Sequence, residues 1–209
     1  MPNDLISPEM RLFTPDGARL YLTSEERRRF LDAASFESPI DRLFCHLLHY
    51  VGCRPSEALA LSAKQVMIDD TAIVIKSLKK HKTDKHGRLK QAQYRSVPVP
   101  PFLIEHLDLV FGLRGVSRNH DIDRVLWPMS RATAYRLVKR VMDRANIKGA
   151  QATGKGLRHG FGVALVTAAK PVPIHVISKL MGHSDSKTTE IYLQVLNEER
   201  HALVMAAWE

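Results

Sequence analysis

The segment that most constrains this fold is residues 154–192, where sharp turns separate three apolar patterns at helical spacing. Apolar residues that recur every three or four positions bury one face of a helix and leave the other face to polar groups. Gly182 closes the second pattern, as glycine does where the chain must turn left-handed. Three short helices joined in this way can bring Arg158, His183 and Tyr192 to one point, although they are far apart in sequence.

These three side chains suit a phosphodiester. The planar fork of an arginine matches two phosphate oxygens, and a histidine adds a hydrogen bond to a third. A tyrosine hydroxyl beside them can act as a nucleophile, because nearby cations favour its ionised form. Taken singly, each residue is more simply explained as a solvated helix residue or, for Tyr192, as part of the core. The combination therefore carries the argument.

The same segment resembles a known family. GLRHGFGVALV followed by LMGHSDSKTTEIYLQV is similar to the C-terminal catalytic motif of tyrosine recombinases, the phage-integrase family. That motif consists of His-x-x-Arg, then Leu-Gly-His-Ser, then a nucleophilic tyrosine nine residues after the second histidine. Tyr192 lies nine residues after His183. The match is specific because it combines residue type, helix periodicity and spacing.

The resemblance implies a role for each residue. Tyr192 would attack the phosphorus and form a 3′-phosphotyrosyl link, while Arg158 and His183 stabilise the charge. GCRPSEALAL is similar to the family's first arginine motif, Gly-x-Arg-x-x-Glu-x-x-x-Leu. Arg54 and Arg158 are therefore expected to clamp the scissile phosphate, whose transition state spreads negative charge. Glu57 can brace Arg54; without the resemblance, the pair would be an ordinary surface ion pair.

A basic stretch interrupts the strand-like patterns QVMIDD, TAIVIKSL and YRSVPVP, which predict a small antiparallel sheet. Residues 71–100 hold eight Lys or Arg and one acid. Such a stretch is either a solvated, mobile loop or a hairpin that contacts phosphates. In the family, a lysine on this hairpin protonates the departing 5′-oxygen. The resemblance favours Lys79 for this role, with Lys80 and Lys82 as close competitors that are otherwise expected to contact DNA.

A basic helix is predicted after Ser130, in RATAYRLVKRVMDRANI. Its apolar side holds Ala134 and Leu137 and leaves the basic residues to other faces. Such a helix can simply face solvent, but beside a phosphodiester site we interpret it as a contact with the major groove or backbone of DNA. The residues expected to make this contact are Arg131, Arg136, Lys139 and Arg140.

These patterns predict an α+β fold, mainly α-helical, with a small antiparallel β-sheet, and the resemblance implies the tyrosine-recombinase catalytic-domain fold. Residues 1–20 lack periodicity and are expected to form an N-terminal arm. Residues 21–209 are expected to form the catalytic domain, including a C-terminal helix in NEERHALVMAAWE, with no separate N-terminal core-binding domain. In the family such a helix commonly docks into a neighbouring protomer, which implies a homo-oligomer on DNA, a dimer or tetramer.

Composition limits the class of binding partner and the cellular compartment to be expected. A formal net charge of +9 and a pI of about 9.7 indicate a polyanionic partner, and the resemblance implies double-stranded DNA; a basic but non-binding surface is the alternative. No apolar run is long enough to span a bilayer, and the N-terminus lacks the apolar segment of a signal peptide. Two cysteines imply no disulfide framework, so a cytoplasmic, DNA-associated protein is expected.

No metal and no cofactor are expected. Cys45, His49 and Cys53 recur at helical spacing, but the surrounding residues are apolar, which favours buried core cysteines over a zinc site. The resemblance implies the same conclusion for catalysis. A protein-linked ester conserves the bond energy, so the reaction needs neither ATP nor a metal ion.

Lys155 departs from the family, which usually has the histidine of His-x-x-Arg at this position. Lysine can donate to a phosphate oxygen, but it is a point charge and a poor base at neutral pH. The presence of Tyr192, both arginines and His183 favours a site-specific DNA recombinase, in which Lys155 is a catalytic donor. Relaxation of supercoils uses the same chemistry. The alternative is a catalytically impaired DNA-binding regulator or accessory protein with the recombinase fold.

Overall fold

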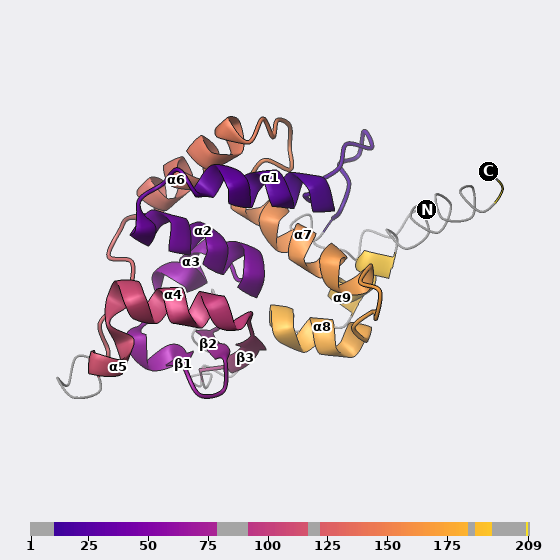
Figure 1. Ribbon diagram of the computed structural model, residues 1–209. Coiled ribbons are helices and arrows are strands. Elements are labelled where there is room, and N and C mark those ends of the chain that lie inside the picture. The colour runs from indigo at the N-terminus through magenta and orange to yellow at the C-terminus, as the bar shows by residue number, and fades with distance from the viewer. Residues whose placement is uncertain (1–10, 79–91, 117–121, 184–186, 194–207, 209) are drawn as a thin grey trace, which may run out of the picture.

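The computed structural model describes residues 11–78, 92–116, 122–183, 187–193 and 208 (Figure 1). It confirms the expected fold class, because helices dominate and one antiparallel sheet has the strand order β1-β2-β3. The helices of the described ranges are α1 Ser24–Ala34, α2 Pro39–Val51, α3 Pro55–Leu59, α4 Pro101–Phe111, α5 Leu113–Val116, α6 Arg131–Arg144, α7 Gly154–Val166, α8 Ile174–Met181 and α9 Lys187–Glu190. The strands are β1 Val66–Met67, β2 Ala72–Lys76 and β3 Tyr94–Pro98, and a 3₁₀ turn covers Ala63–Gln65.

Local sequence signals set the ends of the first helices. The Thr23 side chain accepts a hydrogen bond from the backbone of Glu26, and the Glu26 carboxylate accepts one from the backbone of Thr23 at 2.9 Å, which makes a capping box. Gly52 ends α2 with a φ of 60°, a conformation that costs glycine little. Pro55 then opens α3, where its missing N–H is harmless. Arg54 is thereby fixed in the short turn between two helices.

The core is organised around α2, which packs against α1, α4 and α7 (Figure 1). Phe44 of α2 is fully buried and meets Trp127 edge-to-face, with ring centroids 5.6 Å apart. Residues 11–20, expected as an arm, turn back on themselves where Phe13 bridges Arg19, and Leu12 is buried. α7 and α8 lie to one side of this stack in Figure 1, with α8 against β3.

The sheet is a short meander with one buried face. In the β2–β3 register Ile73 pairs with Val97 and Ile75 pairs with Arg95. All four of these residues are buried, whereas Tyr94, Ser96 and Pro98 alternate with them on the exposed face. Arg95 therefore points inward, although it belongs to the basic stretch that was expected to face DNA.

Cys45 and Cys53 are free thiols in the core. Burial raises the pKa of both to about 12, so they are protonated at neutral pH. Across the described ranges, no group of three or more His, Cys, Asp or Glu side chains is arranged to hold a metal ion. Across the same ranges, no helix combines the length and apolar character needed to cross a membrane.

Candidate active site

Arg158 lies where two helix ends converge. Its guanidinium donates from Nη1 to the Gly52 carbonyl at 2.7 Å and from Nη2 to the Met181 carbonyl at 2.5 Å. These carbonyls sit at the C-terminal ends of α2 and α8, where the helix dipole favours a cation. Burial, together with the charge of Arg54, lowers the pKa of Arg158 to about 10, which still leaves it charged at neutral pH. An arginine has five N–H donors, so two such bonds leave others for an oxyanion.

Close packing of α7 against the α2 end holds this arrangement. A Cβ on Gly52 would lie 2.3 Å from the ring of Phe161. Phe161 stands one turn after Arg158 on α7. Position 52 therefore needs a glycine for two reasons. Its backbone is left-handed, and a larger residue would prevent the close approach of α7. This approach brings the Gly52 carbonyl to the guanidinium of Arg158.

Arg54 caps α3 and is held by Glu57. The Glu57 carboxylate accepts from the Arg54 backbone N–H at 3.0 Å and from Arg54 Nη1 at 3.1 Å. Glu57 is 2% exposed, and burial alone would raise its pKa. A hydrogen bond from Arg95 and the surrounding cations outweigh burial, so the pKa of Glu57 lies below its ordinary value. The predicted contact between Glu57 and Arg54 is present, and the Arg54 side chain remains 46% exposed toward any incoming anion.

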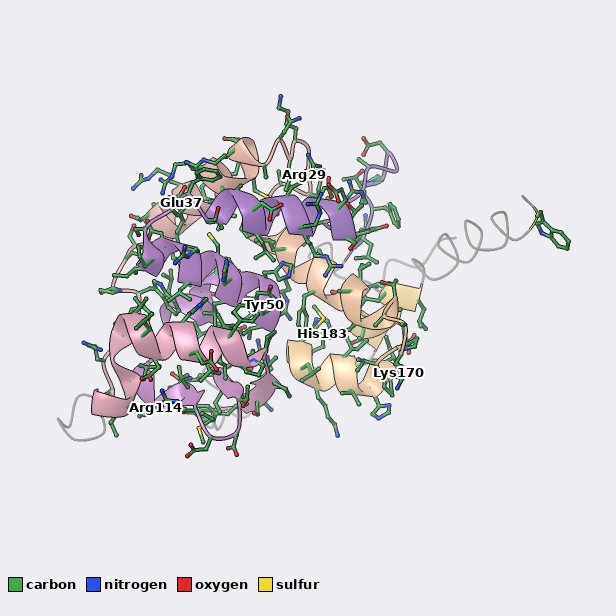
Figure 2. All side chains as sticks on the ribbon, in the orientation of Figure 1. Arg29, Glu37, Tyr50, Arg114, Lys170 and His183 are labelled. Carbon is green, nitrogen blue, oxygen red and sulfur yellow. The ribbon has the colours of Figure 1, made fainter. Side chains whose placement is uncertain are left out.

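His183 follows the Gly182 turn at the end of α8 and lies between α7 and α8 (Figure 2). Its Nδ1 lies 2.8 Å from the hydroxyl of buried Thr189. Its Nε2 is buried without a hydrogen-bond partner among the described residues. Burial, with the charges of Arg158 and Arg54, lowers the pKa of His183 to about 3, so the ring is neutral. If Thr189 donates to Nδ1, the ring proton sits on Nε2, where it can be given to a phosphate oxygen.

Tyr192 is fully buried, and its hydroxyl bonds to His159 rather than facing solvent. The hydroxyl lies 3.1 Å from His159 Nδ1, and the ring packs so tightly on α7 that a Cβ on Gly162 would lie 2.4 Å from it. Burial raises the pKa of Tyr192 above its ordinary value, and the charge of Arg158 offsets only part of this. Arg158 does favour the ionised tyrosine, as expected, but burial outweighs it, so the hydroxyl is protonated in this conformation. Desolvation dominates because the hydroxyl has left water.

Of the remaining predicted residues, some are described by the structure and others lie outside the described residues. Lys155 is exposed near the start of α7, one turn before Arg158 and His159, and its charge helps to lower the pKa of His159 to about 3 after burial, the larger cause. Three residues of the basic stretch lie outside the described residues, namely Lys79, Lys80 and Lys82. The same holds for the predicted C-terminal helix, apart from exposed Trp208.

The basic residues of α6 differ in their engagement. Arg131 and Arg136 are exposed. Arg140 instead places Nε and Nη2 at 3.1 and 2.6 Å from the Glu37 carboxylate, which Figure 2 labels beside α6. Lys139 is half-buried and donates to the Ala152 carbonyl at 3.2 Å. Lys139 and Arg140 are therefore held by other segments of the protein, whereas Arg136 donates to Thr133 of its own helix at 3.3 Å.

Sequence reasoning missed three residues of this site: Arg95, His159 and Thr189. Arg95 shares the inward parity of Val97 in YRSVPVP, which was the available signal. His159 directly follows Arg158, but nothing in the sequence links it to Tyr192. Thr189 precedes Tyr192 by one helical turn, and its contact with His183 depends on the turn between them.

Known proteins share this fold and these segments. The model of the Phage integrase family matches residues 20–199. Tyrosine recombinase XerA of Thermococcus onnurineus (strain NA1) is 31% identical over 181 residues, which are 85% of this chain and 58% of that protein. Tyrosine recombinase XerD of Neisseria meningitidis serogroup B (strain ATCC BAA-335 / MC58) is 28% identical over 182 residues, which are 84% of this chain and 57% of that protein.

Solved structures agree in fold. A crystal structure of XerA recombinase has a TM-score of 0.64 at 24% identity and covers 82% of this chain and 59% of its own. XerH site-specific recombinase, bound to palindromic difH substrate in a post-cleavage complex, has a TM-score of 0.69 at 22% identity, over 90% of this chain and 53% of its own. The fold is thus that of tyrosine-recombinase catalytic domains. The chain belongs to the phage integrase family, and it spans less than two thirds of the length of the relatives named here.

Proposed function

We propose that this protein is a site-specific DNA recombinase that cleaves and rejoins double-stranded DNA through a 3′-phosphotyrosyl intermediate. The observation that carries the proposal is the pair of guanidiniums, Arg54 and Arg158, which come from segments about a hundred residues apart. The charge of Arg54 contributes, after burial, to the lowered pKa of Arg158, so the two guanidiniums belong to one site. Glu57 already bonds to Arg54 but leaves its side chain 46% exposed, so a phosphodiester can still bind to both guanidiniums.

The proposed reaction exchanges one ester for another. The Tyr192 oxygen attacks phosphorus and forms a bond to the 3′-phosphate, the phenol proton passes to water, and the bond to the 5′-oxygen breaks. Lys79, or Lys80 or Lys82 in its place, gives a proton to that leaving oxygen. Rejoining reverses these steps, so neither ATP nor a metal ion enters the balance.

The other site residues bind and stabilise charge. Arg54 and Arg158 hold the non-bridging oxygens, His183 donates from Nε2, and exposed Lys155 adds a fixed positive donor. Because the Tyr192 hydroxyl is buried against His159, it has to leave this bond before it can attack. We therefore assign the described conformation to the resting protein without DNA. We propose that DNA binding releases the Tyr192 hydroxyl from His159.

The partner surfaces follow from the same proposal. Exposed Arg131 and Arg136 are available to DNA phosphates directly, whereas Lys139 and Arg140 would have to exchange the protein contacts described above. We further propose that residues 21–209 act as the catalytic domain, that protomers assemble on DNA through the C-terminal helix as a dimer or tetramer, and that the reaction takes place in the cytoplasm. XerH and the Tn1549 transposon integrase, which share the fold, have been solved with DNA.

A nicked suicide DNA tests the proposal. The substrate carries the terminal repeats of the protein's own element, with a nick placed so that the cleaved fragment diffuses away and rejoining fails. The proposal predicts a covalent protein–DNA adduct that survives denaturation. DNA binding without any adduct would instead support the catalytically impaired regulator.

A further inference from the structure

Arg95 of β3 is a buried arginine with every nitrogen of its guanidinium engaged inside the protein. Its side chain is 7% exposed. Nε donates to the Leu180 carbonyl at 2.8 Å, and Nη2 donates to Glu57 Oε2 at 2.6 Å. Nη1 lies 3.3 Å from the Ser77 hydroxyl and 3.5 Å from Glu57 Oε1. A guanidinium used in this way has no face left for DNA, so Arg95 cannot serve as a phosphate contact of the basic stretch.

The contact with Glu57 connects Arg95 to the first arginine of the site. Glu57 accepts from Arg95 on one side and from Arg54 on the other. Two hydrogen-bonded cations keep this buried carboxylate ionised, and an ionised carboxylate is the better acceptor. Arg95 therefore fixes the anchor that orients Arg54, without approaching the place where a phosphate would bind.

The contact with Leu180 connects Arg95 to the end of α8. Leu180 and Met181 present consecutive carbonyls, the first to Arg95 and the second to Arg158. Gly182 follows with a φ of 65°, and a Cβ there would lie 2.9 Å from Arg95 Nη1. The turn before His183 thus packs directly against the Arg95 side chain. Ser77, the third partner, follows β2 at the base of the basic stretch.

We propose that Arg95 is a positioning residue that holds Arg54, through Glu57, and His183, through the end of α8, in one arrangement for the scissile phosphate. The proposal rests on the proposed recombinase function. Lysine cannot replace arginine here, because one ammonium nitrogen cannot span the Glu57 carboxylate and the Leu180 carbonyl together. A lysine at position 95 would still supply a positive charge beside Glu57, whereas a methionine would not. Comparing Arg95→Lys with Arg95→Met therefore separates the effect of geometry from the effect of charge.

The test compares parent, Arg95→Lys and Arg95→Met in single-turnover cleavage of the suicide DNA at saturating protein, with DNA affinity and thermal unfolding measured on the same samples. Arg95→Lys should fold and bind DNA as the parent does, yet cleave roughly 10²-fold more slowly, the loss expected from a small misplacement of reacting groups. Arg95→Met should lose at least as much rate. If the methionine variant does not fold, Arg95→Lys decides the question.

Arg144→Met is the matched control, because Arg144 also donates to a glutamate with a 7% exposed side chain, Glu37, and to a backbone carbonyl, that of Ala33, away from the site. It should lower thermal stability and leave the cleavage rate unchanged. Cleavage by Arg95→Lys at the parent rate overturns the proposal. The proposal is also overturned if weaker DNA binding by Arg95→Lys explains its whole loss of cleavage rate, because Arg95 would then be a DNA contact.

A second readout separates this proposal from the proposed function. Binding of inorganic vanadate is followed through the ring resonances of His183 in parent and Arg95→Lys. The proposal predicts weaker vanadate binding by the variant, whether or not the parent cleaves DNA. A parent that forms no adduct would remove the recombinase function alone, whereas equal vanadate affinity in both proteins would overturn the role of Arg95.

Discussion

Glu57 and Tyr192 are both almost fully buried, yet burial has opposite outcomes in the two halves of the site. Around Glu57, hydrogen-bonded arginines outweigh desolvation and keep the carboxylate ionised. Around Tyr192, desolvation outweighs the charge of Arg158 and keeps the hydroxyl protonated against His159. Under the proposed function, the phosphate-binding half is preorganised before substrate arrives, whereas the nucleophile half has to rearrange. Preorganised donors of this kind act in the transition state without further reorganisation.

Arg158→Lys should give the largest effect on the phosphate-binding half. A lysine cannot hold the Gly52 and Met181 carbonyls and a phosphate at once, so single-turnover cleavage should fall by about 10²–10³-fold, as for loss of a charge-stabilising donor. Arg144→Lys, a similar change away from the site, should cleave as the parent does. If Arg158→Lys cleaves normally, this half is not the phosphate clamp.

Lys155 gives a somewhat smaller effect, because its exposed ammonium is screened by water. Lys155→Ala should slow cleavage by about 10²-fold, near the lower limit for loss of a donor to the reacting phosphate. Lys155→His should remain active but acquire a new pH dependence near its ionisation, at pH ~6.5. Cleavage rates between pH ~6 and ~8 provide the measurement. An alanine variant as fast as the parent would place Lys155 outside the site.

Two histidines make the site sensitive to mild acid, His159 beside Tyr192 and His183 beside the phosphate-binding arginines. The pKa values of His159 and His183 are about 3 in the folded protein, against about 6.5 for an unfolded histidine. Between these values the unfolded chain binds more protons, so the stabilising contribution is complete above pH ~6.5 and is lost as pH falls toward ~3. At pH 5 each histidine should contribute roughly 2 kcal/mol less stability than at pH 7.

Variants identify the histidines responsible, since His46 and His49 of α2 have lowered pKa values as well, about 4 and about 3. Chemical unfolding at pH 7 and pH 5 should show a smaller loss of stability on acidification in His159→Gln than in the parent. Glu57→Gln should leave this loss unchanged, because a carboxylate with a depressed pKa loses its contribution only below its ordinary range. Equal acid sensitivity of His159→Gln and the parent would show that His159 is not held neutral beside Tyr192.

Gly162→Ala should give the smallest effect. Its new methyl group would meet the Tyr192 ring at 2.4 Å, so the folded state should lose about 1 kcal/mol, the lower range for overpacking, if the ring shifts outward. A ring displaced toward water should also ionise at lower pH, which ultraviolet titration against Tyr192→Phe can detect. Gly115→Ala is the control, because a Cβ there would meet nothing within 4 Å. Unchanged tyrosine titration would show that Gly162 does not confine Tyr192.

Local features were the predictable part of the fold. The structure confirms the predicted alternation of β3, and the capping box at Thr23 and the glycine at the end of α2 are likewise decided by neighbouring residues. The contact between Arg54 and Glu57 was predictable for the same reason, because it spans three residues of one motif. The resemblance also implies that Arg54 and Arg158 act on one phosphate, and this stays a prediction.

Contacts set by tertiary packing were not predictable. Arg95 appeared to be one more cation of a basic stretch, because its partners Glu57 and Leu180 are 38 and 85 residues away. The state of Tyr192 depends on the competition between burial and the charge of Arg158, and residue types alone do not decide that competition. The sequence therefore identified the chemical groups but not the resting arrangement of the nucleophile.

The covalent link itself tests the central claim most directly. The protein trapped on suicide DNA is digested with a protease, and the peptide that carries the nucleotide is identified by mass spectrometry. The account predicts attachment at Tyr192 in the parent, and no attachment in a Tyr192→Phe variant that still binds the DNA. An adduct on any other residue, or an adduct that persists in Tyr192→Phe, would contradict it.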